Sequence, residues 1–210
     1  EKPPWQSLRI NRLKGGGEPE RNLKASMEPV PWNGDGYYYK EEARPGKHPF
    51  HEAGVYYIQE ASAMLPAVYL DAKPGEIILD LCAAPGGKST QIAGAMGGRG
   101  ILVCNEIHPG RAKILSENIE RMGIRNAVVT SHEPEVLAER FPGYFDKILV
   151  DAPCSGEGMF RKNGEAVFQW SPENVTMCAK RQKSILESAS SMLKGGGRIV
   201  YSTCTFSTEE

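Results

Sequence analysis

The chain has 210 residues, of which 40% are hydrophobic and 24% charged, a composition that allows one good-sized core and a small second lobe. Its formal net charge of −1 excludes a molecule-wide attraction to nucleic acid, so any affinity for RNA depends on local patches. There is neither an apolar run near the roughly 20 residues of a membrane helix nor a secretory signal, and we therefore expect a cytoplasmic protein without membrane contact.

Residues 1–50 are rich in Pro and Gly and contain two short strand-like runs, at 8–11 and 37–40. This pattern predicts a small irregular α+β lobe. The first 24 residues carry six Lys or Arg against three Glu, which gives the lobe a local positive charge suited to a polyanion.

The chain changes character at His51. A helical stretch is predicted from there through Gln59 and Met64, and Pro66 is suited to opening a second short helix that ends before Pro74.

After Gly75, strand-like apolar runs alternate with segments of helical period. The expected strands are 77–82, 101–105, 127–130, 147–151 and 198–202, and the expected helices are 88–96, 109–122 and 180–193, the last closed by the glycines 195–197. Because such alternation produces parallel strands joined by right-handed crossovers, residues 51–210 are predicted to form an α/β doubly wound, Rossmann-like sheet. Ligands of these sheets bind beyond the carboxyl ends of the strands.

The first of these strands leads into a glycine-containing turn, Asp80-Leu-Cys-Ala-Ala-Pro-Gly-Gly-Lys-Ser89, and then a helix. A helix N-terminus offers free N–H donors and a positive dipole end, so the turn is suited to an anionic group. A phosphate-binding loop would need Gly where Cys82 stands, and Pro85 removes a backbone donor. Since the run 148–151 also resembles the strand that holds magnesium in such enzymes, a P-loop NTPase remains the alternative.

Glu106 follows the second strand, about 20 residues after the turn, where nucleoside-binding folds place an acid against ribose hydroxyls. An anion-binding turn and a ribose acid without a phosphate nest fit S-adenosylmethionine. The five cysteines lack Cys-x-x-Cys spacing, and we expect no metal.

Two further strands each end near a cysteine, in Asp151-Ala-Pro-Cys154 and Ser202-Thr-Cys204. If these strands are neighbours, about 4.8 Å apart, both thiols can reach one small ring. Methylation of cytosine at carbon-5 needs a thiolate to add first at carbon-6. Protonation or hydrogen bonding at ring N3 would stabilise the charge pushed into the ring, and Asp151 is placed to provide it. The residues alone leave either Cys154 or Cys204 as the nucleophile.

Three stretches in order, 82–88, 151–158 and 202–204, resemble the Nop/Sun family of RNA 5-methylcytosine methyltransferases, particularly its bacterial small-subunit rRNA branch, and 51–60 adds further similarity. The resemblance implies Cys204 as nucleophile, Cys154 in product release and Asp151 in catalysis. It implies that S-adenosylmethionine contacts Cys82, Ala83, Ala84, Pro85, Gly86, Gly87, Lys88, Glu106, Asp151 and Glu133, the last standing where the family more often has Asp.

For RNA contact we expect Arg161 and Lys162, just beyond the second cysteine motif, with Arg9 and Arg12 as outer phosphate contacts. The expected partner is small-subunit rRNA, with tRNA as the alternative, and the protein is expected to be a monomer. Residues 1–50 would form an RNA-recognition lobe. Family members continue with further strands after the Thr-Cys motif, and we expect missing sequence on each side of this chain.

Overall fold

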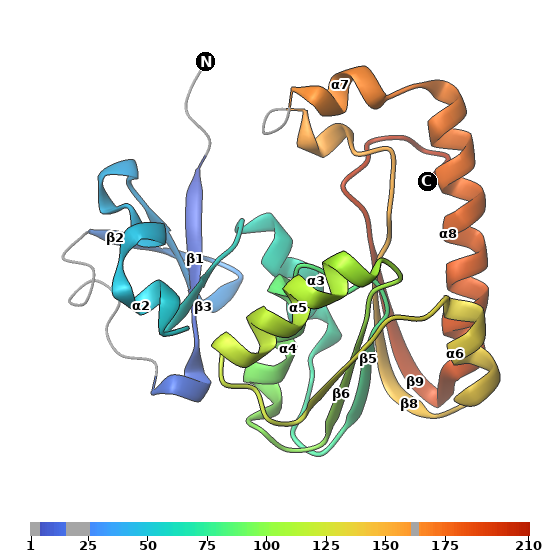
Figure 1. The fold of residues 1–210 in the computed structure, drawn as a ribbon, viewed down its shortest axis with the longest axis horizontal. Coiled ribbons are helices and arrows are strands. Elements are labelled where there is room, and N and C mark those ends of the chain that lie inside the picture. The colour runs from blue at the N-terminus through green and yellow to red at the C-terminus, as the bar shows by residue number, and fades with distance from the viewer. Residues whose placement is uncertain (1–4, 16–25, 161–163) are drawn as a thin grey trace.

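A computed structural model describes residues 5–15, 26–160 and 164–210. In this part of the chain, one sheet of four strands has the order β2-β3-β1-β4 and another of five strands has the order β7-β6-β5-β8-β9. Figure 1 shows the small sheet on the side of helices α4 and α5, and the long helix α8 on the opposite side of the larger sheet.

The small antiparallel sheet forms the N-terminal lobe. It consists of β1 (Gln6–Ile10), β2 (Met27–Val30), β3 (Asn33–Tyr39) and β4 (Tyr56–Ile58), with β1 between β3 and β4. Leu8, Ile10, Met27 and Tyr56 are its buried core.

Strand β4 corrects the helix predicted from His51 to Met64. Only the short α2 (Pro49–Glu52) and a turn at 62–64 are helical there, because the aromatic run 56–58 pairs with β1, Tyr56 opposite Ile10 and Ile58 opposite Leu8. Such β-favouring residues take the strand form when a partner edge is available. The small sheet therefore extends past residue 50.

The larger sheet confirms the predicted α/β fold. Its strands are β5 (Ile77–Asp80), β6 (Ile101–Asn105), β7 (Ala127–Thr130), β8 (Phe145–Asp151) and β9 (Leu193–Ser202), and every adjacent pair is parallel. The chain builds outward from β5 to β7 and then crosses to β8 on the other side. The strand order thus reverses between β5 and β8, where ligands of doubly wound sheets bind.

Helices cover both faces of this sheet. On one face lie α3 (Leu65–Leu70), α4 (Gly87–Met96) and α5 (Pro109–Arg121), and on the other lie α6 (Pro134–Arg140) and α8 (Pro172–Met192). Because side chains alternate along a strand, Ile78 joins the first core and Leu79 the second. No helix in the described ranges is long and apolar enough to cross a membrane.

Helix α8 begins eight residues before the predicted Lys180. Ser171 accepts a hydrogen bond from the backbone N–H of Asn174 at 3.1 Å, and Pro172 occupies the first turn, so the helix starts at a strong N-terminal signal. The glycines 195–197 lie inside β9 rather than ending the helix.

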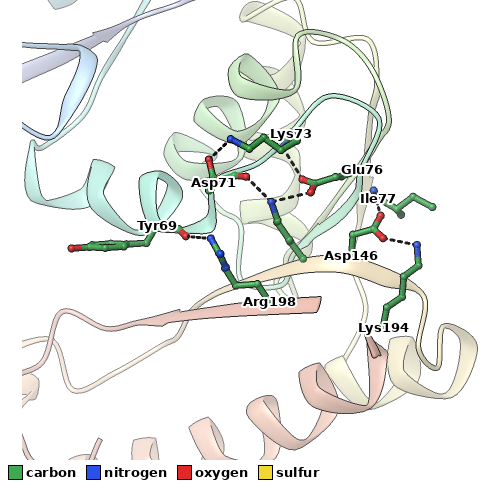
Figure 2. Close-up of polar contacts among 9 residues, drawn as sticks. Tyr69, Asp71, Lys73, Glu76, Ile77, Asp146, Lys194 and Arg198 are labelled. Carbon is green, nitrogen blue, oxygen red and sulfur yellow. Dashed lines mark hydrogen bonds and ion pairs between the residues drawn. The ribbon is translucent and has the colours of Figure 1, made fainter. Parts of the chain in front are cut away.

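A polar network ties the amino ends of the strands together (Figure 2). Asp146 accepts from the backbone N–H of Ile77 at 2.8 Å and pairs with Lys194 at 2.7 Å, and Arg198 donates to the carbonyl of Tyr69 at 3.1 Å. These contacts link α3, β5, β8 and β9 at the end of the sheet opposite the carboxyl ends.

Candidate active site

The ends of β8 and β9 bring the two cysteine motifs together. Asp151 and Ser202 are register partners at the carboxyl ends of these neighbouring strands. Beyond them, the sulfur atoms of Cys154 and Cys204 lie 3.2 Å apart, a separation at which one thiol donates a hydrogen bond to the other sulfur. The two strands are neighbours, which is the condition under which the sequence allowed both thiols to reach one place.

Asp151 has both carboxylate oxygens engaged. Its Oδ2 lies 2.6 Å from the Nζ of Lys88, and its Oδ1 accepts a hydrogen bond from the Ser202 hydroxyl at 2.8 Å. Lys88 comes from the start of α4, so this ion pair spans from the glycine turn after β5 to the end of β8. The carboxylate is thereby held in a fixed orientation beside the thiol pair.

The two thiols differ in acidity. The hydrogen bond from Cys154 lowers the pKa of Cys204 to about 7, with the positive charge of Lys88 contributing, although burial and Asp151 oppose the shift. The same hydrogen bond raises the pKa of Cys154 above its usual range, and burial adds to the effect. At neutral pH this arrangement favours a thiolate on Cys204 and a protonated Cys154, which supports Cys204 as the nucleophile.

A cavity of 520 Å³ opens in front of this pair, between the ends of β5 and β6 and the two cysteine loops. Its volume lies within the range of small-molecule sites. Seven of the predicted residues line it: Cys82, Ala84, Glu106, Glu133, Asp151, Cys154 and Cys204. Sequence reasoning missed other lining residues, among them Ile107, His108, Arg111, Met159 and Arg181.

Glu106 is almost fully buried at the cavity wall, with 3% of its surface exposed. Its Oε1 accepts from the backbone N–H of His108 at 3.0 Å, and its Oε2 lies 3.4 Å from the Arg111 guanidinium, which also donates to the carbonyl of Ala84. The carboxylate is therefore oriented at the place where a ribose acid is expected. The position of Arg111 in the first turn of the helix after Glu106 was the available sequence signal for this contact.

A second hollow, of 270 Å³, lies on the other side of the glycine turn, against β4. It is lined by Ala83, Pro85, Gly87 and Lys88 and shares Cys82, Ala84 and Asp151 with the main cavity. Gly86 instead faces α5, where an added Cβ would lie 3.1 Å from Leu115, and its φ of +111° favours glycine. Tyr57 and Gln59 also line this hollow. Neither was identified from the sequence, because the pattern of this segment predicts a helix.

Asp80, at the end of β5, is another buried acid beside the second hollow. Its Oδ2 accepts from the Ser89 hydroxyl at 2.6 Å, and among the described residues its Oδ1 has no hydrogen-bond partner. Burial raises the pKa of Asp80 to about 7. No group of His, Cys, Asp and Glu in the part of the chain that the structure describes is arranged to hold a metal ion.

The prediction of Arg9 as an outer phosphate contact is wrong. Arg9 is 3% exposed, and its guanidinium donates to Gln59 at 3.0 Å, to Thr90 at 2.7 Å and to the carbonyl of Gly87 at 3.1 Å. Its neighbours along β1, Leu8 and Ile10, lie in the core of the lobe. Arg9 therefore points to the opposite face of the strand, where its guanidinium contacts α4 instead of solvent.

The other predicted RNA contacts differ in their status. Arg12 forms an ion pair with Asp35 at 2.7 Å. Because 67% of its side-chain surface is exposed, Arg12 can still be reached from solvent. Arg161 and Lys162 lie outside the described residues.

Comparison with protein families gives two matches in chain order. Residues 67–210 match the family described as 16S rRNA methyltransferase RsmB/F, and residues 1–61 match the N-terminal domain of 16S rRNA methyltransferase RsmF. Ribosomal RNA small subunit methyltransferase F of Vibrio atlanticus is 43% identical over the whole of this chain. The chain spans 46% of that relative, about half the length of the curated relatives it matches.

Solved structures agree with the fold. A methyltransferase homologue from Pyrococcus horikoshii is 33% identical, with a TM-score of 0.86 over all of this chain and 67% of its own. The structure of NSun6 from Pyrococcus horikoshii with SFG has a TM-score of 0.84 at 21% identity, over 98% of this chain and 77% of that one. At that lower identity the second likeness bears on the fold alone.

Proposed function

Because the chain belongs to the 16S rRNA methyltransferase RsmB/F family, we propose that it transfers a methyl group from S-adenosylmethionine to carbon-5 of a cytosine in small-subunit rRNA. The family membership confirms the resemblance noted in the sequence and favours a methyltransferase over a P-loop NTPase. The observation that carries the proposal is the 3.2 Å pair of Cys154 and Cys204 at the rim of the cavity that Glu106 lines.

The residues present fit the cofactor of this S-adenosylmethionine-dependent family. The buried carboxylate of Glu106 is suited to accept hydrogen bonds from ribose hydroxyls, and Cys82, Ala84 and Glu133 line the same cavity. SFG, which the NSun6 structure contains, is an analogue of S-adenosylmethionine. When bound, the cofactor would supply the methyl group. The residues of the protein would hold the cytosine and activate its carbon-5 for methylation.

The thiolate of Cys204 adds to carbon-6 of the ring, and the electron pair of the C5–C6 bond becomes available at carbon-5. A proton delivered through Asp151 to ring N3 neutralises the charge pushed into the ring. The carboxylate, held in place by Lys88 and Ser202, then accepts a hydrogen bond from N3–H. After carbon-5 takes the methyl group, a base removes the proton from carbon-5, the C–H electrons re-form the C5–C6 double bond, and the C6–S bond breaks to release the thiolate of Cys204. Cys154, protonated beside the departing sulfur, assists this release.

The rest of the proposal concerns RNA contact. The N-terminal lobe, predicted from the sequence at residues 1–50 and extended by β4, would recognise RNA through Arg12, and Arg161 and Lys162 would bind phosphates near the cysteine loops. The remaining loop residues, Ala83, Pro85, Gly86, Gly87 and Lys88, would shape the cofactor end of the site. We propose that the protein acts in the cytoplasm as a monomer, with small-subunit rRNA preferred over tRNA.

The test is a methylation assay with S-adenosylmethionine labelled in the methyl group. The purified protein is incubated with unmethylated 16S rRNA and, separately, with tRNA, and the RNA is digested to nucleosides. We expect label in 5-methylcytidine from 16S rRNA. Label in an N-methylated nucleoside would overturn the carbon-5 chemistry, and label confined to tRNA would overturn the rRNA assignment.

A further inference from the structure

Glu157 joins the two cysteine loops through one carboxylate. Three residues beyond Cys154, its Oε2 accepts hydrogen bonds from the Ser155 hydroxyl at 3.1 Å, from the Thr205 hydroxyl and from the backbone N–H of Phe206 at 3.0 Å. Its Oε1 accepts from the indole N–H of Trp170 at 2.9 Å. Donors from the Pro-Cys loop, the Thr-Cys loop and the segment before α8 therefore converge on a single side chain.

The next residue brings the two loops into backbone contact. The N–H of Gly158 donates to the carbonyl of Cys204 at 2.7 Å. A Cβ at position 158 would lie 2.7 Å from that carbonyl oxygen, closer than side chains normally approach. The pair Glu157-Gly158 thus fixes the backbone of the residue that carries the nucleophilic sulfur.

A second carboxylate anchors the same loops to α8. Glu210 accepts from the backbone N–H of Ser155 at 2.9 Å and from the amide of Gln182 at 2.9 Å. Gln182 also donates to the carbonyl of Pro153 at 3.1 Å. The Pro-Cys loop is consequently held by α8 on one side and by the Thr-Cys loop on the other.

Glu157 stands behind the site rather than in it. Among the described residues, the main cavity is lined by Gly156 and Met159 on either side of it, but not by Glu157. Burial opposes ionisation of this carboxyl, yet the hydrogen bonds from Thr205, Phe206 and Trp170 lower its pKa to about 2. It therefore accepts hydrogen bonds as a carboxylate throughout the neutral range and has no proton to give.

We propose that Glu157 is a positioning residue that holds the Pro-Cys and Thr-Cys loops at the spacing which keeps the thiols of Cys154 and Cys204 in contact. Strand pairing aligns the chain only as far as Asp151 and Ser202. Beyond that point, four donors on one carboxylate and the Gly158 contact set the distance between the loops. The inference rests on the proposed function only in taking these thiols as the catalytic pair.

The test compares Glu157→Ala, Glu157→Gln and Gly158→Ala with the wild-type protein. The control variant is Glu187→Gln, at an exposed position on α8. One readout is the rate at which iodoacetamide alkylates Cys204 across pH 6–10, followed by mass spectrometry of the peptide that carries it. The other is kcat and KM for 16S rRNA. Thermal melting checks that each variant is folded.

We expect Glu157→Ala to move the alkylation profile of Cys204 from about 7 towards the ordinary thiol range, because the hydrogen bond from Cys154 is lost. It should also lower kcat by about 100-fold with little change in KM, the order of loss that follows a displacement of about 1 Å. Glu157→Gln keeps one oxygen acceptor, so its alkylation profile and its kcat should lie between those of the wild-type protein and those of Glu157→Ala. Gly158→Ala should shift the profile in the same direction while retaining the carboxylate.

An alkylation profile unchanged in all three variants would overturn the positioning role, whatever the activity. If Glu157→Ala does not fold, the Gln and Gly158 variants decide the same question. If the wild-type protein does not methylate 16S rRNA, the proposed function is contradicted. A shifted alkylation profile in the variants would still support the positioning role of Glu157.

Discussion

The ammonium group of Lys88 lies 2.6 Å from the carboxylate of Asp151 and joins the glycine turn after β5 to the strand end that carries the cysteine motif. The pair places a positive charge near Cys204, where it favours the thiolate, and a carboxylate that would accept a hydrogen bond from a protonated ring N3 in the proposed cytosine substrate. One contact between residues 63 positions apart thus links the cofactor side and the base side of the site.

Replacing Lys88 by Met should shift the reaction to higher pH. The pKa of Cys204 is about 7, lowered first by Cys154 and also by Lys88, so loss of this positive charge raises it and leaves less thiolate at pH 7. Activity of Lys88→Met should be reduced several-fold at pH 7 and recover partly as pH rises above the new pKa. Iodoacetamide alkylation of Cys204 against pH measures the shift, and the exposed Lys113→Met is the control. A profile that stays at about 7 would contradict this.

The two cysteines should give opposite phenotypes. Cys204→Ala removes the proposed nucleophile and should abolish methyl transfer without forming an adduct, whereas Cys154→Ala should allow addition but slow release. The expected result for Cys154→Ala is a protein–RNA species that survives denaturing electrophoresis and disappears with Cys204→Ala in the double variant. An adduct in the Cys204→Ala protein instead would reverse the roles.

Glu106 should determine cofactor affinity. Hydrogen bonds to a charged group contribute about 1.5–3 kcal/mol, so Glu106→Ala should weaken S-adenosylhomocysteine binding roughly 10- to 100-fold. Isothermal titration calorimetry measures the change, with Glu117→Ala on the exposed face of α5 as control. Equal affinities of the two variants would show that the ribose contact lies elsewhere.

Arg9 and Arg12 should separate stability from RNA affinity. Arg9→Met leaves the buried side-chain oxygen of Gln59 without this donor, removes the contacts to Thr90 and Gly87, and should destabilise the fold by roughly 3 kcal/mol. Arg12→Met breaks an exposed ion pair, worth about 0–1 kcal/mol, and should weaken RNA binding in a salt-dependent manner. Urea denaturation and RNA titration at two salt concentrations measure both effects. A larger stability loss at Arg12 than at Arg9 would refute the distinction.

Much of the larger sheet could be predicted because its signals are local. The periods of the apolar residues place β5 to β8 and most of α4 and α5, and the motifs around Cys82, Cys154 and Cys204 lie directly after strands. Two predictions failed because the conformation or burial at those positions depends on residues that are distant in the sequence. The run 56–58 is a strand because β1 offers it an edge, and Arg9 is buried because its face of β1 packs against α4.

The sequence by itself determined the fold class, the family and the residue types of the site, since these depend on periodicity, turn residues and motifs read along the chain. Only the tertiary structure decided which groups touch: the thiol pair, Lys88 with Asp151, Arg111 with Glu106, and the convergence of donors on Glu157. The thiol pair, the Lys88–Asp151 pair and the contact of Thr205 with Glu157 join residues 50, 63 and 48 positions apart. Their distances follow from packing and strand register, which no local pattern encodes.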